Sequence, residues 1–144
     1  MLFFTGFPRN ASDIAEEQIR KIPEKKRELK AMMEMVDEAL SILNGSQDRL
    51  TDFGKLLHET WKIKRSLTPH ITNQFIDEVY EAAMEAGALG GKLLGAGGGG
   101  FILLFVEPEL QHNVKKKLER LLYVPFRFQS LGSQIIYYAP EENL

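Results

Sequence analysis

Cysteine is absent from the 144 residues of this chain. This absence excludes a disulfide framework, thiolate metal sites and a cysteine nucleophile, and it makes a reducing cytoplasm the expected compartment. Long apolar runs are absent too, because the longest, Phe101–Val106, is too short to span a bilayer. No basic region precedes an apolar core at the N-terminus, as it would in a signal peptide. Neither sign of charge dominates, since the net charge is −2, so nucleic acid and membranes are not expected partners.

The hydrophobic content, 44%, is enough for one domain with one core. Met1 runs directly into Leu2-Phe3-Phe4, an apolar segment with no cap or polar lead. A complete domain usually begins with a few solvated residues. We therefore expect residues 1–144 to be one domain of a longer protein, with Met1 as an added or internal start.

Helical spacing of apolar residues dominates the chain up to Gly87. Asn10 can cap a short helix that Pro23 interrupts. Apolar residues three and four positions apart predict further helices over about 24–44, with Gly45 as the C′ residue, over about 47 or 50 to 67, and from Thr72 or Asn73 to 86. The apolar residues at helical spacing in the 24–44 helix are Leu29, Met32, Met33, Val36, Leu40 and Leu43. The stripe of the 72–86 helix consists of Phe75, Val79, Ala82, Ala83 and Ala86.

Extended segments are predicted at the N-terminus and after Gly87. Leu2–Phe7 is typical of a strand, and Lys92–Leu94 and Phe101–Val106 predict two strands joined by a glycine loop. Pro108 is expected to begin a helix that carries Leu110, Val114, Leu118, Leu121 and Leu122.

Two short strands are predicted near the C-terminus, over Phe126–Gln129 and Gln134–Ala139, with Gly132 in the turn between them. Together these elements predict an α+β fold, with a mainly antiparallel sheet of four to five strands and helices packed on one face.

Eight of the twelve glycines fall between Gly87 and Gly100. The segment Gly95–Gly100 satisfies the spacing G-x-G-x-x-G, which suits a dinucleotide fingerprint, a protein-kinase loop or a plain turn. A dinucleotide site needs a helix after the glycines, whereas Phe101–Val106 predicts a strand. A Walker-type P-loop needs Gly-Lys-Ser/Thr at its end, and Gly100-Phe101 supplies neither lysine nor hydroxyl.

A protein-kinase loop fits the strand-turn-strand context, and Asp52-Phe53-Gly54 spells the magnesium-binding tripeptide of those enzymes. The tripeptide, however, precedes the glycines, lies within a predicted helix and has no H-R-D segment to accompany it. We interpret Asp52–Gly54 as helix.

A glycine run has no Cβ atoms to obstruct close approach and can adopt positive φ, so that consecutive N–H groups converge on an anion. Lys92, just before the run, would add positive charge. The alternative is a flexible hairpin, but five glycines in six positions are more than a turn requires. We therefore favour an anion-binding loop.

Three segments resemble one kinase superfamily, the galactokinase, homoserine, mevalonate and phosphomevalonate (GHMP) kinases. Gly90–Phe101 resembles their third conserved motif. The stretch from His58-Glu59-Thr60-Trp61 through Lys64-Arg65-Ser66-Leu67 to Phe105 resembles the D-glycero-D-manno-heptose 7-phosphate kinase branch. Thr5-Gly6-Phe7-Pro8-Arg9 resembles a threonine-glycine-x-x-arginine segment that this branch shares with fucokinases.

The resemblance implies the ferredoxin-like C-terminal domain of a kinase that uses ATP and Mg²⁺ to phosphorylate a sugar phosphate. It also implies that the main ATP loop and the catalytic aspartate belong to an N-terminal half outside residues 1–144, so we expect this chain to fold but to be inactive alone. The expected partners are ATP, the sugar phosphate, that N-terminal domain, and a second copy if an uncovered face self-associates. No catalytic or metal-binding residue is expected, and the phosphate or substrate residues are Thr5, Arg9, Lys92, Gly95, Ala96, Gly97, Gly98, Gly99 and Gly100.

Several other residues allow two interpretations of their role. Arg9 could grip a sugar phosphate or lie on a solvated turn. Trp61 is expected in the core, although a tryptophan can also stack on a sugar. Lys62 and Lys64 are expected to be surface charges, and His58, His70 and His112 to have surface or packing roles. The solvent-exposed face of a helix is expected to carry Lys115-Lys116-Lys117 and Arg120.

The sequence is also compatible with two alternative functions. One is a fucokinase or another branch of the superfamily, and the other is a ligand-binding or regulatory module that has the fold without catalysis.

Overall fold

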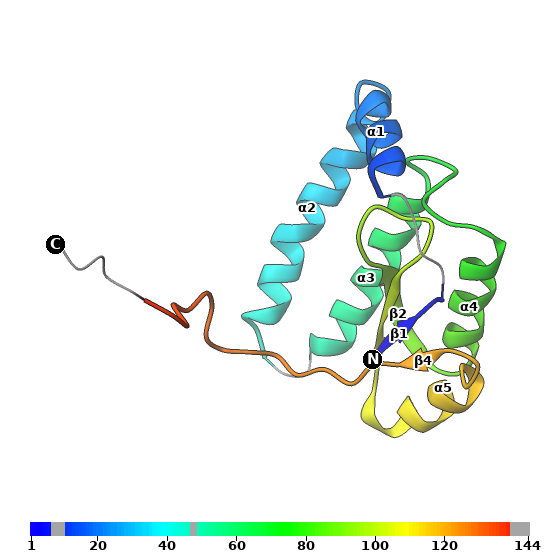
Figure 1. Cartoon of the computed structure of the whole chain (residues 1–144), viewed down its shortest axis with the longest axis vertical. Helices are drawn as coiled ribbons and strands as arrows, with labels where there is room; N and C mark the ends of the chain where they lie inside the picture. Colours follow the sequence, from blue (N-terminus) through cyan, green and yellow to red (C-terminus); the bar gives the residue numbers. More distant parts are fainter. Residues whose placement is uncertain (7–10, 47–48, 139–144) are drawn as a thin grey trace, which may run out of the picture.

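The computed structural model describes residues 1–6, 11–46 and 49–138 (Figure 1). Four helices lie between the first strand and the remaining three. The strands are β1 (Leu2–Phe4), β2 (Ala88–Leu93), β3 (Phe101–Val106) and β4 (Leu122–Tyr123). The helices are α1 (Ala11–Lys21), α2 (Lys26–Leu43), α3 (Leu50–Arg65), α4 (Gln74–Glu85), the 3₁₀ turn η2 (Pro108–Leu110) and α5 (Gln111–Lys117).

The four strands form one antiparallel sheet in the order β2-β3-β1-β4. The N-terminal strand β1 is therefore central, with Leu2 opposite Leu103 and Phe4 opposite Leu122. The predicted α+β class and antiparallel sheet are confirmed. The predicted strand Phe101–Val106 is confirmed with the same ends, because a continuous apolar run suits a strand buried in the middle of a sheet.

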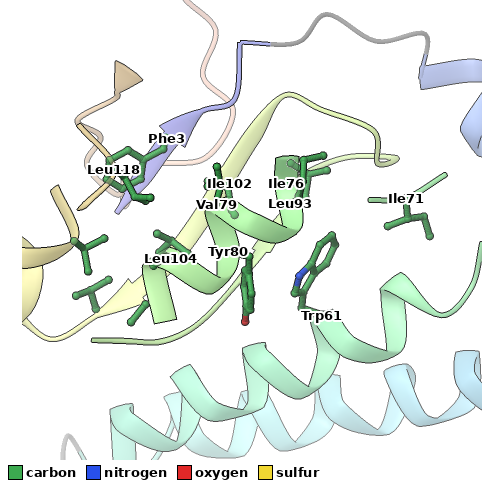
Figure 2. Close-up of a cluster of buried hydrophobic side chains, with 14 of the residues drawn as sticks. Phe3, Trp61, Ile71, Ile76, Val79, Tyr80, Leu93, Ile102, Leu104 and Leu118 are labelled. Carbon is green, nitrogen blue, oxygen red and sulfur yellow. The ribbon is translucent and has the colours of Figure 1, made fainter. Parts of the chain in front are cut away.

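The main core lies between one face of the sheet and helices α4 and α5 (Figure 2). Helix α4 begins where Asn73 accepts a hydrogen bond from the N–H of Ile76 at 3.0 Å, as an N-cap does, which confirms the predicted start. Trp61 is fully buried beside Tyr80 and Leu93, so its core interpretation is confirmed. The fully buried side chains include Phe3, Trp61, Ile71, Ile76, Leu93, Ile102, Leu104 and Val114.

Helix α3 lies against β2, and the contact is made through glycines. A Cβ atom at Gly90 would stand 2.0 Å from the carbonyl oxygen of Gly54 and 2.8 Å from the backbone nitrogen of His58. A Cβ atom at Gly54 would lie 2.8 Å from the side chains of Leu89 and Phe105. The segment Asp52–Gly54 is thus part of a helix, as interpreted from the sequence, and its glycine permits close packing.

The apolar stripe of α2 is mostly exposed. Ile42 is the buried residue of this helix, while Met33, Val36, Leu40 and Leu43 are each more than half exposed. A shallow groove between α2 and α3 is nevertheless lined by four residues of this stripe, Met32, Val36, Leu40 and Leu43, together with Met35 and Ala39. The apolar periodicity therefore predicted the helix correctly, and the face that it marks lies toward α3 without being fully buried.

Several predicted boundaries are wrong. The predicted strand Lys92–Leu94 begins earlier, at Ala88, so Gly90 and Gly91 belong to β2. The helix expected to run from Pro108 to Leu122 ends at Lys117, because Leu122 pairs with Phe4 in the sheet. The predicted strand Leu2–Phe7 ends at Phe4, and Phe7 lies outside the described residues, as do Asn10 and Gln47.

The two strands predicted after β4 are also absent from the described part of the chain. Residues 124–138 form no strand. Val124 still donates to the carbonyl of Leu2 at 2.9 Å, and the chain after it runs away from the body of the molecule (Figure 1), while Ala139 lies outside the description. Phe128 is 94% exposed and Ile136 is 97% exposed. Among the described residues, no helix is both long and apolar enough to cross a membrane.

Candidate functional site

The predicted anion loop connects β2 to β3 and lies close to α1 (Figure 1). Four of its residues, Gly95, Gly97, Gly98 and Gly100, have φ values between 74° and 130°. Residues other than glycine rarely adopt such positive φ values, so the path of the loop requires glycine at these positions. The path of the loop therefore depends on the conformational freedom of glycine at these positions.

Three side chains from three different segments hold the carbonyl groups of the loop. Lys64, near the end of α3, donates from Nζ to the carbonyl of Gly95 at 2.6 Å and to that of Leu93 at 3.3 Å. Gln18 of α1 donates to the carbonyl of Ala96 at 2.6 Å. Asn73, the cap of α4, donates from its amide to the carbonyl of Gly98 at 3.3 Å.

The end of the loop is tied to β1 through Thr5. The hydroxyl of Thr5 donates to the carbonyl of Gly100 at 2.9 Å and accepts from the N–H of Gly100 at 3.0 Å. The N–H of Thr5 also donates to that carbonyl at 2.8 Å. Thr5 is 2% exposed, so its hydroxyl is a buried part of the loop's own support.

These bonds determine which way the loop's amide groups point. In a trans peptide the N–H points opposite to the preceding carbonyl, and no described peptide is cis. The N–H of Ala96 therefore points away from Lys64, and that of Gly99 points away from Asn73. Two other amides are used inside the protein, because Gly98 donates to the carbonyl of Ile71 at 2.9 Å and Gly100 donates to Thr5.

Fewer amide groups of the loop are therefore available to bind an anion than the glycine run predicted. Gly95 is exposed and Ala96 and Gly98 are half-buried, while Gly97 and Gly99 are buried and make further contacts. The part of the loop open to a ligand is its first turn, at Gly95-Ala96.

The structure places Lys92 within β2, opposite Leu103. Because strand side chains alternate, Lys92 points to the face opposite the buried Leu93, and the described residues give it no hydrogen bond or ion pair with the loop. The lysine that contacts the loop is Lys64, which is 9% exposed rather than the surface charge expected. Arg9 lies outside the described residues, so its role stays a prediction.

The signal for Lys64 was present in the sequence but was not decisive. Lys62 and Lys64 stand two apart on a helix, so they cannot share a face. Lys62 is exposed and pairs with Glu59 at 3.0 Å, whereas Lys64 follows Trp61 onto the buried side. Position 64 also falls in the segment that resembles heptose-phosphate kinases, which was a reason to assign it more than a surface role.

The histidines take the packing and surface roles expected of them. Nδ1 of His58 lies 2.7 Å from the hydroxyl of Tyr80, and the two rings stack. His70 pairs with Glu17, and His112 is exposed on α5. Lys115 to Lys117 are exposed too, as predicted. Among residues 1–6, 11–46 and 49–138, no group of three acidic or histidine side chains is placed to hold a metal ion.

Comparison with known proteins agrees with this geometry. Residues 9–124 match the family model described as GHMP kinases C terminal. The chain is 32% identical over 123 residues to D-glycero-alpha-D-manno-heptose 7-phosphate kinase of Campylobacter jejuni, with 83% of this chain and 35% of that protein covered. It is 25% identical over 124 residues to the bifunctional fucokinase/GDP-fucose pyrophosphorylase of Arabidopsis thaliana, covering 83% of this chain and 12% of that protein.

A solved structure shares the fold. The mevalonate kinase of Methanococcus jannaschii superposes with a TM-score of 0.67 and 28% identity, over 83% of this chain and 35% of that one. The chain therefore belongs to the GHMP kinase family, in the part that forms the C-terminal domain. It spans about a third of the length of the heptose 7-phosphate kinase that it matches.

Proposed function

We propose that this chain acts as the C-terminal part of an ATP-dependent kinase whose acceptor is a sugar phosphate, with D-glycero-D-manno-heptose 7-phosphate as the first candidate. The observation that carries the proposal is the glycine loop, whose backbone is fixed by Lys64, Gln18, Asn73 and Thr5. The 32% identity to a heptose 7-phosphate kinase supports the choice of acceptor.

The loop suits phosphoryl transfer because that reaction depends on positioning and on neutralising charge around the transferred group. The amide of Ala96 is directed away from Lys64, and we propose that a phosphate approaches from that side. Lys64 adds a fixed positive charge behind the same turn. ATP would supply the phosphoryl group, and Gly95 and Ala96 are the residues we propose to contact its phosphates.

The described residues do not provide a complete site for Mg²⁺, since no three suitable ligands converge. We propose that the Mg²⁺ ligands, the main ATP loop and the catalytic base belong to the N-terminal half that the family resemblance implies. The same half is the proposed partner of this domain. The exposed apolar residues of the C-terminal segment, such as Phe128 and Ile136, are suited to such a contact. Self-association through the same surface is the alternative.

Arg9 keeps its proposed role as a ligand of the acceptor's non-reacting phosphate. Thr5 lies four residues before it and is fixed to the loop at Gly100, so the chain that leads to Arg9 starts from the site. Replacing Arg9 with alanine should raise the KM for the sugar phosphate and leave that for ATP nearly unchanged, because the contact is made to one substrate.

The similarity to a fucokinase supports a second candidate, in which the acceptor is a sugar without a phosphate. A non-catalytic module with the same fold is the remaining alternative. A kinase assay separates all three, using the protein made from its complete coding sequence, ATP and a panel of D-glycero-D-manno-heptose 7-phosphate, L-fucose and mevalonate. We expect turnover with the heptose phosphate and none from residues 1–144 alone. Turnover of order 1 s⁻¹ from residues 1–144 would contradict the proposal that catalysis needs a further half.

A further inference from the structure

We propose that a polar cavity between α1, the turn before α4 and the glycine loop binds the hydroxyl-bearing body of the acceptor sugar. This inference rests on the proposed kinase function and adds the residues that recognise the acceptor. The cavity has a volume of about 480 Å³ and reaches the loop at Gly98. Its polar lining comes mainly from Asp13, Glu17 and Arg20 of α1 and from His70 and Asn73.

The mixture of donors and acceptors in this cavity suits a polyol. A sugar hydroxyl both donates and accepts a hydrogen bond, so a site for several hydroxyls needs both kinds of group side by side. Asp13 and Glu17 supply acceptors, Arg20 supplies donors, and His70 can supply either. A phosphate group alone would meet two carboxylates here, and its negative charge would be repelled. The neutral, hydroxylated part of the acceptor is therefore the better occupant.

Glu17 is held in place before any ligand arrives. One of its carboxylate oxygens lies 3.5 Å from Nζ of Lys21, and the other is hydrogen-bonded by Nδ1 of His70. The hydrogen bond from His70 lowers the pKa of Glu17 below its ordinary value, which favours the carboxylate form. A carboxylate has about four acceptor positions, so two remain for ligand hydroxyls. A pre-oriented acceptor loses little entropy when it binds a sugar.

The cavity and the glycine loop share a wall. Asn73 donates to the carbonyl of Gly98, and Gln18 on α1 donates to that of Ala96, so both sides of the cavity are bonded to the loop. A Cβ atom at Gly98 would lie 2.7 Å from the terminal methyl group of Ile14, which is part of the same lining. The glycine thus lets α1 approach the loop, and a sugar in the cavity would lie beside the proposed phosphate-binding turn.

A second, larger cavity of about 750 Å³ lies between β1, α4 and the end of α5. Its lining combines apolar residues such as Phe75 and Leu118 with polar residues such as Glu78, Lys117 and Arg120. However, it contains none of the residues Gly95–Gly100. The smaller cavity is therefore the better match to an acceptor that must reach the loop, and its volume is within the range of small-molecule sites.

Hydrogen-exchange mass spectrometry on the protein from its complete coding sequence tests where the acceptor binds. D-glycero-D-manno-heptose 7-phosphate should slow exchange in residues 11–21 and 68–73. Inorganic phosphate at the same concentration should not. Equal protection by inorganic phosphate, or protection confined to residues 117–122, would overturn the assignment of this cavity to a polyol.

Two substitutions test the recognising groups. Glu17→Gln and Asp13→Asn should each weaken binding of the sugar phosphate about tenfold or more by calorimetry, because each removes a charged acceptor. The affinity for ATP should be unchanged. Glu16→Gln is the matched control, since Glu16 is exposed on the same helix and is not part of the cavity lining. Both variants should melt cooperatively, and Asp13→Asn leaves the Glu17–His70 pair intact.

The failure of this inference differs from failure of the proposed function. If the parent protein phosphorylates the sugar and both variants bind it as tightly as the parent, the cavity assignment is wrong and the kinase proposal stands. If the parent phosphorylates mevalonate and no sugar, the proposed acceptor is wrong and the cavity assignment falls with it.

Discussion

Two groups of glycines lie a few residues apart in this protein, and they serve different ends. Gly90 in β2 stands against Gly54 of α3, at a contact where a Cβ atom would come within 2.0 Å of a backbone oxygen. Gly98 in the loop has a φ of 74°, and a Cβ atom there would meet the tip of a flexible side chain. The first glycine is required by its neighbours, and the second by its own backbone conformation.

The comparison teaches that a glycine-rich motif can combine a packing requirement and a functional one. Gly90 and Gly98 both fall in the segment that resembles the family's third motif. From the sequence alone they look equivalent. In the structure, Gly90 determines how closely helix α3 approaches the sheet, and Gly98 determines how the loop approaches α1 and the polar cavity. Substitutions should separate the two roles.

Gly90→Ala should have the largest effect. The new methyl group would collide with the backbone of α3 at Gly54 and His58, which cannot move without shifting the helix. We expect the free energy of unfolding to fall by about 3 kcal/mol or more. Urea denaturation followed by circular dichroism measures this loss. Gly132→Ala is the control, because no atom lies within 4 Å of a Cβ there. Equal stability of the two variants would contradict the close α3–β2 contact.

Gly98→Val should act on function more than on stability. Valine disfavours the φ of 74° and would press on Ile14, so the loop should lose its shape. We expect kcat/KM to fall by about a hundredfold in the protein from the complete coding sequence, with about 1–2 kcal/mol lost from the free energy of unfolding. Gly97→Val is a less clean test, because its Cβ atom would lie 2.6 Å from Cα of Ile71. Normal turnover of Gly98→Val would make the loop a connector.

Lys64→Met tests the side-chain support of the loop separately from its glycines, because no glycine is changed. The substitution keeps the apolar stem but removes the donor to the carbonyls of Leu93 and Gly95. We expect the free energy of unfolding to fall by about 2 kcal/mol and exchange of the amides in residues 94–100 to accelerate. Lys62→Met, the matched control on the exposed side of α3, should change stability by about 0.5 kcal/mol or less. Equal losses of stability and equal amide exchange in the two variants would show that Lys64 acts only as a surface charge.

The smallest effect should be seen at alkaline pH, in the core beside Gly91. Burial raises the pKa of Tyr80 from 10.0 to about 12. The folded state then holds the phenolic proton more tightly than the unfolded state, so stability is lost as pH rises from 10 toward 12. We expect a loss of about 1–2 kcal/mol across this range, measured by urea denaturation. Tyr80→Phe should remove the slope, and an unchanged slope in that variant would assign it to another group.

Local patterns allowed much of the fold to be predicted. Phe101–Val106 is an unbroken apolar run, and its two ends were predicted correctly. Thr72 or Asn73 was predicted to begin α4, and Asn73 is the cap in the structure. Both features depend on residues that are close together in the sequence, so local sequence patterns are enough to predict them.

Features that depend on distant partners were missed. The alternating apolar residues in 126–138 favour strands, but a strand also needs a neighbouring strand to pair with, and the described structure offers none. Gly90 was left out of the predicted strand, which began at Lys92, because the residue that requires a glycine there, Gly54 of α3, lies far away in the sequence. Lys64 looked solvated for the same reason, since the carbonyls that it binds lie about thirty residues further along.

The central position of β1 has a consequence for the order in which this domain can be assembled on the ribosome. Thr5 must find Gly100, 95 residues later, before the loop has its final anchor. At about 5–20 residues per second, synthesis of the intervening chain takes roughly 5 to 20 s. Until then, β1 has no partner and must remain accessible, and the closure of so long a loop is slow. The candidate site is therefore among the last parts of the domain to form, and a nascent chain that folds its helices early still has no glycine loop in its final geometry.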